Sequence, residues 1–135
     1  MQYLTKRVRF SASHRLHSPE LSDTENQRVY GMCNNPNGHG HNYVLDVTLA
    51  GRPDPKTGMI MDLKKIGDML DERLIAAVDH RHLNLDVPFL EGVIPTVENL
   101  ASVFWQRLAP LFPAGTLHEI RLAETDSSWV VYRGE

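Results

Sequence analysis

The chain has 135 residues, enough for one domain with its own hydrophobic core, which we expect to span residues 1–135. Its 14 basic and 17 acidic residues give a formal net charge of −3, which argues against a nucleic-acid or membrane-surface partner. A single cysteine excludes an internal disulfide and fits a reducing compartment. No apolar run approaches the roughly 18 residues of a membrane helix, and no signal-peptide core opens the chain. These features predict a cytoplasmic protein.

The first third of the chain predicts two strands. Apolar residues alternate with polar ones between Lys6 and His14, as they do in a strand with one buried face. The alternation returns from His41 to Leu49. The polar stretch between them, residues 19–31, predicts a loop with one helical turn at Ser22 to Gln27. Basic residues without any acid before residue 20 suggest a solvated edge strand, or alternatively a strand facing an anionic substrate such as a phosphate chain.

The remaining chain predicts two helices followed by two strands. Asp62 is a candidate cap for a helix that runs to Val78, and Thr96 for a second helix that ends near Pro110. Residues 117–132 read as two strands that meet at residues 126–128. This order predicts an α+β fold, a four-stranded antiparallel sheet with two helices on one face. Since such a sheet leaves its edge strands open, we also expect a homo-oligomer.

Three histidines form a candidate metal site. His39 and His41 lie on the same face of the second strand, about 6.6 Å apart along it, and share that face with apolar residues. His14 ends the apolar face of the first strand, which an antiparallel neighbour would bring alongside. Three neutral imidazoles that leave a fourth position open are typical of catalytic zinc rather than structural zinc. His17, of opposite parity, is a weaker candidate ligand, and the alternative for any one histidine is an ordinary buried hydrogen bond.

Cys33 stands six residues before the histidine pair, and the residues alone leave three interpretations open. The thiol could be buried and inert, as most free cysteines are. It could be a fourth zinc ligand, which would close the site. It could also be a thiolate close to the metal that acts as a general base, with a pKa lowered by the adjacent positive charge.

Specific motifs, in order along nearly the whole chain, resemble the 6-pyruvoyltetrahydropterin synthase family. They are Phe10–Ser18, Cys33–Tyr43, Asp79-His80, Thr96–Asn99 and Glu124–Asp126. The resemblance implies a tunnelling-type fold and a homohexamer, a dimer of trimers whose sheets close into a barrel, with active sites at subunit interfaces. It also implies a zinc-dependent lyase that converts 7,8-dihydroneopterin triphosphate to 6-pyruvoyl-tetrahydropterin, with elimination of triphosphate, in tetrahydrobiopterin biosynthesis.

The same resemblance implies roles for individual residues. The zinc ligands would be His14, His39 and His41, and Cys33 would be the general base. Asp79 and His80 would complete its proton relay, and Glu124 would bind the pterin ring and share in the relay. Thr96 matches a position near the pterin, although a helix cap is its more ordinary role, and Val97 departs from the paired threonines of the family pattern.

Two other functions remain open at this point. The related 6-carboxytetrahydropterin synthases of queuosine biosynthesis share the fold, the zinc site and the substrate, but release acetaldehyde. The longer spacer Asn34–Asn37 and the pair Asn42-Tyr43 look more like the pyruvoyl enzymes. A more distant alternative is a non-enzymatic, zinc-stabilised binding module, in which Cys33 would be a ligand. The cations that meet the triphosphate are not fixed by the sequence; Arg9, Arg15 and His17 are candidates.

Overall fold

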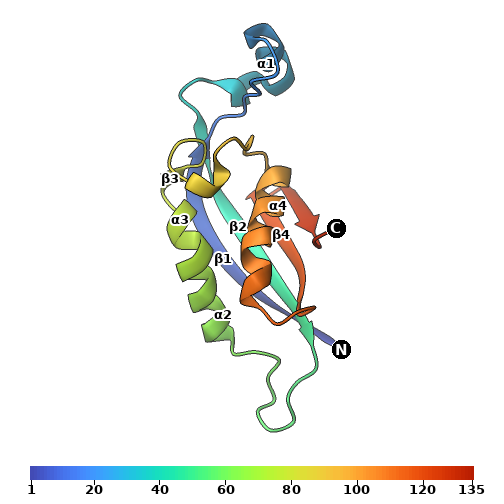
Figure 1. Cartoon of the computed structure of the whole chain (residues 1–135). Coiled ribbons are helices and arrows are strands. Elements are labelled where there is room, and N and C mark those ends of the chain that lie inside the picture. The colour runs from blue at the N-terminus through green and yellow to red at the C-terminus, as the bar shows by residue number, and fades with distance from the viewer.

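The chain folds around one mixed β-sheet, and the computed structural model describes all 135 residues. The strands are β1 (Gln2–His14), β2 (His39–Gly51), β3 (Arg81–His82), β4 (Leu117–Thr125) and β5 (Ser128–Tyr132). They lie in the order β3-β1-β2-β4-β5, and only the pair β1–β3 is parallel. Figure 1 shows the long strands β1, β2 and β4 side by side behind the helices. This sheet carries the first candidate ligands at one end.

The register between β1 and β2 decides which side chains meet. The pairing runs without interruption from Gln2 opposite Gly51 to His14 opposite His39. Phe10 therefore lies opposite Tyr43, and their rings stack with centroids 4.7 Å apart on the buried face. Because successive side chains point to opposite faces, a slip of one residue would move His14 off this face. The hydrophobic pattern thus also fixes the place of the histidines.

Two helical segments cover the same face of the sheet (Figure 1). They are α2 (Leu63–Leu70), which continues through a π-helical turn (Asp71–Ile75) into α3 (Ala76–Val78), and α4 (Val97–Leu108). The Asp62 carboxylate accepts a hydrogen bond from the backbone N–H of Lys64, and Thr96 Oγ1 accepts one from Asn99. Both predicted helices and both predicted caps are confirmed.

The hydrophobic core lies between the sheet and these helices. Its fully buried side chains include Tyr43, Leu45, Val47 and Leu49 of β2, Ile66, Leu70 and Leu74 of the α2 segment, Leu100, Phe104 and Leu108 of α4, and Ile120 and Leu122 of β4. The other face of the sheet has no helix over it (Figure 1). There the Asp46 carboxylate accepts two hydrogen bonds from the Arg7 guanidinium, at 2.7 and 2.9 Å. No helix is long and apolar enough to span a membrane.

Residues 15–38 leave the sheet between β1 and β2 and form a projection that we call the arm. It contains α1 (Asp23–Tyr30) and a 3-10 turn (Gly31–Asn34), and Figure 1 shows α1 at the end of the molecule, away from the other helices. Ser22 and Glu25 cap α1 reciprocally, the side chain of each accepting from the backbone N–H of the other. A complete helix of eight residues replaces the single turn predicted at residues 22–27.

The prediction of four strands, all antiparallel, is wrong both in the number of strands and in their direction. A fifth strand, β3, adds to the sheet, and it runs parallel to β1, pairing at Ala12 and Ser13. A strand of two residues has too few positions to show alternation, so the sequence carries no signal for it. In addition, β1 begins at Gln2 rather than Lys6. Short 3-10 turns at Pro88–Leu90 and Ala109–Leu111 complete the chain. The α+β class itself is confirmed.

Candidate metal centre and active site

Three histidines meet where β1 ends and β2 begins. One ring nitrogen from each of His14, His39 and His41 lies within 4.8 Å of the others. Nε2 of His14 and Nε2 of His39 are 3.2 Å apart. Two ligands of one tetrahedral zinc, at bonds of about 2.0–2.1 Å, would be separated by about 3.3–3.4 Å. The predicted histidine cluster is therefore present, with a spacing that suits one metal ion; His17 lies outside it.

Gly38 allows the chain to enter β2 at this point. Its φ is +75°, and a Cβ atom there would lie 2.9 Å from the backbone oxygen of His14. Only glycine combines this left-handed conformation with so close an approach. The turn before His39 is thus fitted against the end of β1, which places His39 opposite His14.

The hydrogen bonds of His14 define its tautomer. Its Nδ1 is 2.8 Å from the carbonyl oxygen of Pro95. Because a carbonyl oxygen only accepts, Nδ1 carries the proton and Nε2 keeps a lone pair directed at the other histidines. The phenol oxygen of Tyr43 lies 3.4 Å from the same Nδ1. Such a hydrogen bond behind a ligating histidine is common in metal sites, where it fixes the orientation of the ring.

Two nitrogens of the cluster are buried without a hydrogen-bond partner, Nδ1 of His39 and Nε2 of His41. Nε2 of His41 is only 3.1 Å from Glu124 Oε1, but the carboxylate lies off the direction required for a hydrogen bond. A buried polar atom without a partner costs free energy, and a metal ion would satisfy one. The donor set therefore fits a divalent metal that prefers nitrogen ligands, as zinc does.

Burial also keeps the cluster in the state that binds metals. Burial lowers the pKa of His14 and the pKa of His41 below the usual imidazole value of about 6.5. The neighbouring His39 lowers both pKa values further, whereas the negative charge of Glu124 opposes the shift. Both imidazoles are consequently neutral at pH 7, as metal ligation requires.

Glu124 lies beside the cluster, on the face of β4 that the helices cover. Its Oε1 is 3.3 Å from Nε2 of His14 and 3.1 Å from Nε2 of His41. The sheet brings it there because β4 pairs with β2, with Ala123 opposite Val44. A carboxylate at this place can orient a bound molecule or accept a proton next to a metal.

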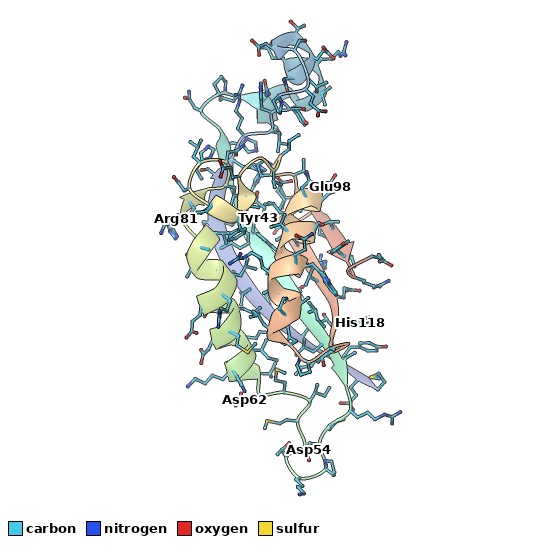
Figure 2. The ribbon with its side chains drawn as sticks, in the orientation of Figure 1. Tyr43, Asp54, Asp62, Arg81, Glu98 and His118 are labelled. Atoms are coloured by element: carbon cyan, nitrogen blue, oxygen red, sulfur yellow. The ribbon has the colours of Figure 1, made fainter.

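Tyr43, which is labelled in Figure 2, is fully buried, and its phenol oxygen lies 3.4 Å from Nδ1 of His14. Burial, and to a smaller extent the charge of Glu124, raises the pKa of Tyr43 well above its usual value. The hydroxyl is therefore protonated at pH 7. The alternation along β2 does not distinguish Tyr43 from its apolar neighbours, although the family motif Cys33–Tyr43 includes it.

Asp79 and His80 lie at the end of α3, where the first predicted helix was expected to stop. His80 has a φ of +60°, which turns the chain so that its Nδ1 comes within 3.0 Å of Asp79 Oδ1. Ser11 holds the pair against β1, since its N–H donates to Asp79 and its carbonyl accepts from the His80 N–H. The Ser11 N–H lowers the pKa of Asp79, and His80 adds to this effect. The His80 side chain itself is largely exposed.

A polar hollow of about 550 Å³, wide open to solvent, lies between the His80 loop and the ends of β1 and β2. Its lining includes Ser11, Ser13, His41, Asn42, His80, Arg81, His82 and Asp86. His41 thus belongs both to the histidine cluster and to the wall of a hollow large enough for a small molecule.

Cys33 lies in the arm, in the 3-10 turn after α1, and is half-buried. Its carbonyl accepts from the Leu16 N–H, and its thiol makes no hydrogen bond to Asp79, His80 or any other residue of the chain. The thiol does not join the three-histidine group. Within one chain, the structure therefore does not bring together all the predicted catalytic residues.

Side-chain hydrogen bonds connect the base of the arm to the sheet. The Asn84 amide accepts from the backbone N–H of Arg15 and donates to its carbonyl, both at 2.8 Å. Arg15 Nε in turn donates to the carbonyl of Asn34, and the Asn34 amide donates to the carbonyl of Leu16 and to His17 Nδ1. Two predicted triphosphate contacts, Arg15 and His17, thus have structural partners here. No pattern in the sequence singles out Asn84.

An α+β fold in which three imidazoles meet at one end of the sheet offers a group that could hold a metal ion, and three histidine nitrogens are a donor set found in catalytic zinc centres. The chain belongs to the 6-pyruvoyl tetrahydropterin synthase family, whose model matches residues 3–135. The family resemblance seen in the sequence motifs is therefore confirmed.

Individual relatives match over almost their full length. The chain is 50% identical to the 6-pyruvoyl tetrahydrobiopterin synthase of Poecilia reticulata over 133 residues, which are 98% of this chain and 90% of that protein. It is 46% identical to the Homo sapiens protein of the same name, covering 98% of this chain and 91% of the relative. A solved structure of 6-pyruvoyl tetrahydropterin synthase from Caenorhabditis elegans has a TM-score of 0.94 at 39% identity, covering 99% of this chain and 96% of that one.

Proposed function

We propose that this chain is a zinc-dependent lyase that converts 7,8-dihydroneopterin triphosphate to 6-pyruvoyl-tetrahydropterin with elimination of triphosphate, a step of tetrahydrobiopterin biosynthesis. The observation that carries the proposal is the convergence of His14, His39 and His41 beside Glu124, in a chain of this family. Relatives that are 40–50% identical bear the name of this enzyme.

The metal would be held by His14, His39 and His41, with Glu124 at the side of the site. When bound, zinc supplies Lewis-acid polarisation of the oxygens of the substrate side chain, which acidifies the adjacent C–H bonds. The neutral imidazoles leave the full charge of the ion available for this polarisation.

The protein residues would bind the substrate and move the protons. Cys33 Sγ is the proposed general base that removes a side-chain proton, and Asp79 with His80 would carry that proton onward. The observed contact of 3.0 Å between His80 Nδ1 and Asp79 Oδ1 supports a relay. The Glu124 carboxylate would accept hydrogen bonds from the amino group and ring N–H of the pterin. The Thr96 hydroxyl caps α4, so the role proposed for this residue is only to lie close to the bound pterin.

We further propose that the active protein is a homohexamer, a dimer of trimers in which the sheets close into a barrel. Both edges of the sheet support association: β5 has no outer neighbour, and β3 covers β1 only at Ala12 and Ser13. A second copy could also place its Asp79 and His80 next to Cys33, since no hydrogen bond joins these groups within one chain.

The test is to incubate zinc-loaded protein with 7,8-dihydroneopterin triphosphate and to identify the products by mass spectrometry. Triphosphate and a 6-pyruvoyl product are expected. A 6-carboxy product with acetaldehyde would replace the proposed reaction by that of the related queuosine enzymes. Absence of turnover by protein that retains zinc would overturn both reactions.

Cys33→Ala separates the enzyme from a zinc-stabilised binding module. For a general base we expect wild-type zinc content and a rate at least about 100-fold lower, the smaller end of what general acid–base catalysis contributes. Loss of zinc from this variant would instead identify Cys33 as a ligand. Met32→Ala is the matched control, because this neighbouring side chain is almost fully exposed.

A further inference from the structure

Tyr43 is a fully buried tyrosine in a position that packing alone would allow phenylalanine to fill. Its ring stacks on Phe10 at 4.7 Å, with an angle of 6° between the planes, inside the hydrophobic core. Its hydroxyl adds a polar group to this core, and a buried hydroxyl is costly unless it is hydrogen-bonded. The hydroxyl therefore calls for an explanation beyond packing.

The only hydrogen-bond partner of the Tyr43 hydroxyl in the chain is Nδ1 of His14, at 3.4 Å. Since the Pro95 carbonyl, at 2.8 Å, already fixes the proton on Nδ1, the phenol oxygen acts as a second, longer acceptor for the same N–H. The proton of the phenol then has no acceptor within the chain. This arrangement is poor for the stability of the metal-free protein, but it holds the His14 ring from two sides.

We propose that Tyr43 is a positioning residue of the metal centre: with the Pro95 carbonyl it clamps Nδ1–H of His14, so that Nε2 points at the bound metal. The hydroxyl lies behind the ring, on the side away from Nε2, and acts through His14 without touching the metal. Outer partners of ligating histidines commonly change metal affinity by 10–100-fold. Because one acceptor remains after removal of the hydroxyl, the effect of Tyr43 should fall near the lower end of this range.

The proposal predicts two effects of opposite direction for Tyr43→Phe. The melting temperature of the metal-free variant should equal or exceed that of the wild type, since a poorly bonded hydroxyl has left the core. Zinc should nevertheless bind about tenfold more weakly in a competition titration with a chromophoric chelator. The visible d–d bands of the cobalt-substituted variant should shift as well, because the His14 ring is less well fixed. A residue important only for packing would move neither the affinity nor the cobalt spectrum.

Tyr132→Phe is the matched control. Tyr132 is a partly buried tyrosine whose ring packs against Trp105, with centroids 5.7 Å apart, and it has no contact with the histidines. This variant should keep the zinc affinity and the cobalt spectrum of the wild type. If Tyr43→Phe, folded by circular dichroism, also keeps both, the proposal is wrong.

The inference rests on the metal part of the proposed function, and its failure can be distinguished from failure of the enzyme reaction. If the wild type binds zinc but turns over no pterin, the reaction is refuted while the role of Tyr43 is still decided by the affinity and the spectrum. If the wild type binds no zinc, the inference and the proposed zinc dependence both fail.

Discussion

Cys33 is close to His39 and His41 in the sequence, but different kinds of structure hold it and the three histidines in place. The histidines lie at the ends of β1 and β2, which pair continuously over their whole length and are packed against the core. Cys33 lies in the arm, whose helix α1 is set apart from the other helices (Figure 1). The base of this arm is connected to the end of the sheet by hydrogen bonds of the Asn34 and Asn84 side-chain amides.

This difference should separate the proposed metal binding from the proposed chemistry of the thiol. The cluster is positioned by the global fold, so it should persist as long as the sheet is folded. The base of the arm depends on the hydrogen bonds of a few polar side chains, so we expect the arm to open locally without unfolding of the sheet. Mutations in the two regions should therefore affect different measurements, and the following variants test this separation.

The largest effect is expected for His41→Ala. Removal of one of three ligands should weaken zinc binding by more than about 100-fold, since even outer partners of ligands change affinity by 10–100-fold. In the metal-free protein Nε2 of His41 is buried without a hydrogen-bond partner, so its removal should offset the packing lost with this mostly buried side chain, and the unfolding free energy should change by less than about 1 kcal/mol. Chelator competition and urea unfolding measure the two quantities.

His118→Ala is a suitable comparison for this variant. His118 lies on β4, where its ring is 4.6 Å from the ring of Tyr3, and it is not part of the cluster. It should leave zinc affinity unchanged. Wild-type zinc affinity in His41→Ala would show that the sheet does not present three ligands, and the contrast between sheet and arm would lose its basis.

The long strands of the sheet and the meeting of its three histidines were largely predictable from the sequence. The period of two in β1 and β2 reports directly which residues share a face, so the common face of His39 and His41 follows from their spacing. The position of His14 beside them depends on an antiparallel pairing that the same pattern makes plausible. Long strands with one buried face are thus where sequence reasoning succeeds.

The arm and the His80 loop were less predictable, for two different reasons. The helix α1 has a signal in the sequence, since Ser22 and Glu25 stand at the spacing of a capping box, and this signal was outweighed by the polar composition. The hydrogen bonds between Asn84 and Arg15, the contact of the Pro95 carbonyl with His14, and the strand β3 have no signal in the sequence, because they form only when distant segments meet. Polar contacts between loops follow no periodic pattern in the sequence, so they cannot be predicted in the way that strands can.

An intermediate effect is expected for Asn26→Ala, within the arm. The Asn26 amide is fully buried; its oxygen accepts from the Ser18 N–H, and its nitrogen donates to the carbonyls of Ser18, Leu21 and Ser22. Loss of these bonds should lower the free energy of local unfolding of the arm by about 2 kcal/mol. The reason is that each buried backbone group left unpaired costs about 1–3 kcal/mol. Amide exchange measured by mass spectrometry should then become about 30-fold faster over residues 18–31.

The same variant should leave amide exchange in β1 and β2 unchanged and keep its zinc affinity, while pterin turnover falls because Cys33 is no longer held in place. Gln27→Ala serves as its control, because Gln27 is the next residue of α1 and is exposed. Faster exchange throughout the sheet, or loss of zinc, would mean that arm and sheet unfold together and that the two regions are not separable.

The smallest effect is expected for Asp46→Asn, on the face of the sheet without helices. Asp46 bridges β1 and β4 by binding Arg7 and, at 3.5 Å, Arg121. Because the Arg7 side chain is half exposed, water screens the pair, and we expect a loss of only about 1 kcal/mol of global unfolding free energy at pH 7. The rate of amide hydrogen exchange in the arm, compared with the rate in the sheet, should not change. Glu119→Gln, which removes a more exposed partner of Arg133, should cost less.

The effect of Asp46→Asn should also depend on pH. The hydrogen bond from Arg7 lowers the pKa of Asp46 in the folded protein, with Arg121 contributing and burial opposing. A carboxylate with a lowered folded pKa stabilises the protein fully above its unfolded pKa of about 3.9, and this contribution is lost as the pH falls through the lower folded value. The difference between wild type and variant should therefore be constant from pH 5 to 8, within about 0.3 kcal/mol, and shrink below about pH 4. Urea unfolding of metal-free protein at pH 7 and pH 3 measures it. An equal difference at both values would mean that the charge of Asp46 does not hold the strands together, and that the sheet derives its stability from the core face alone.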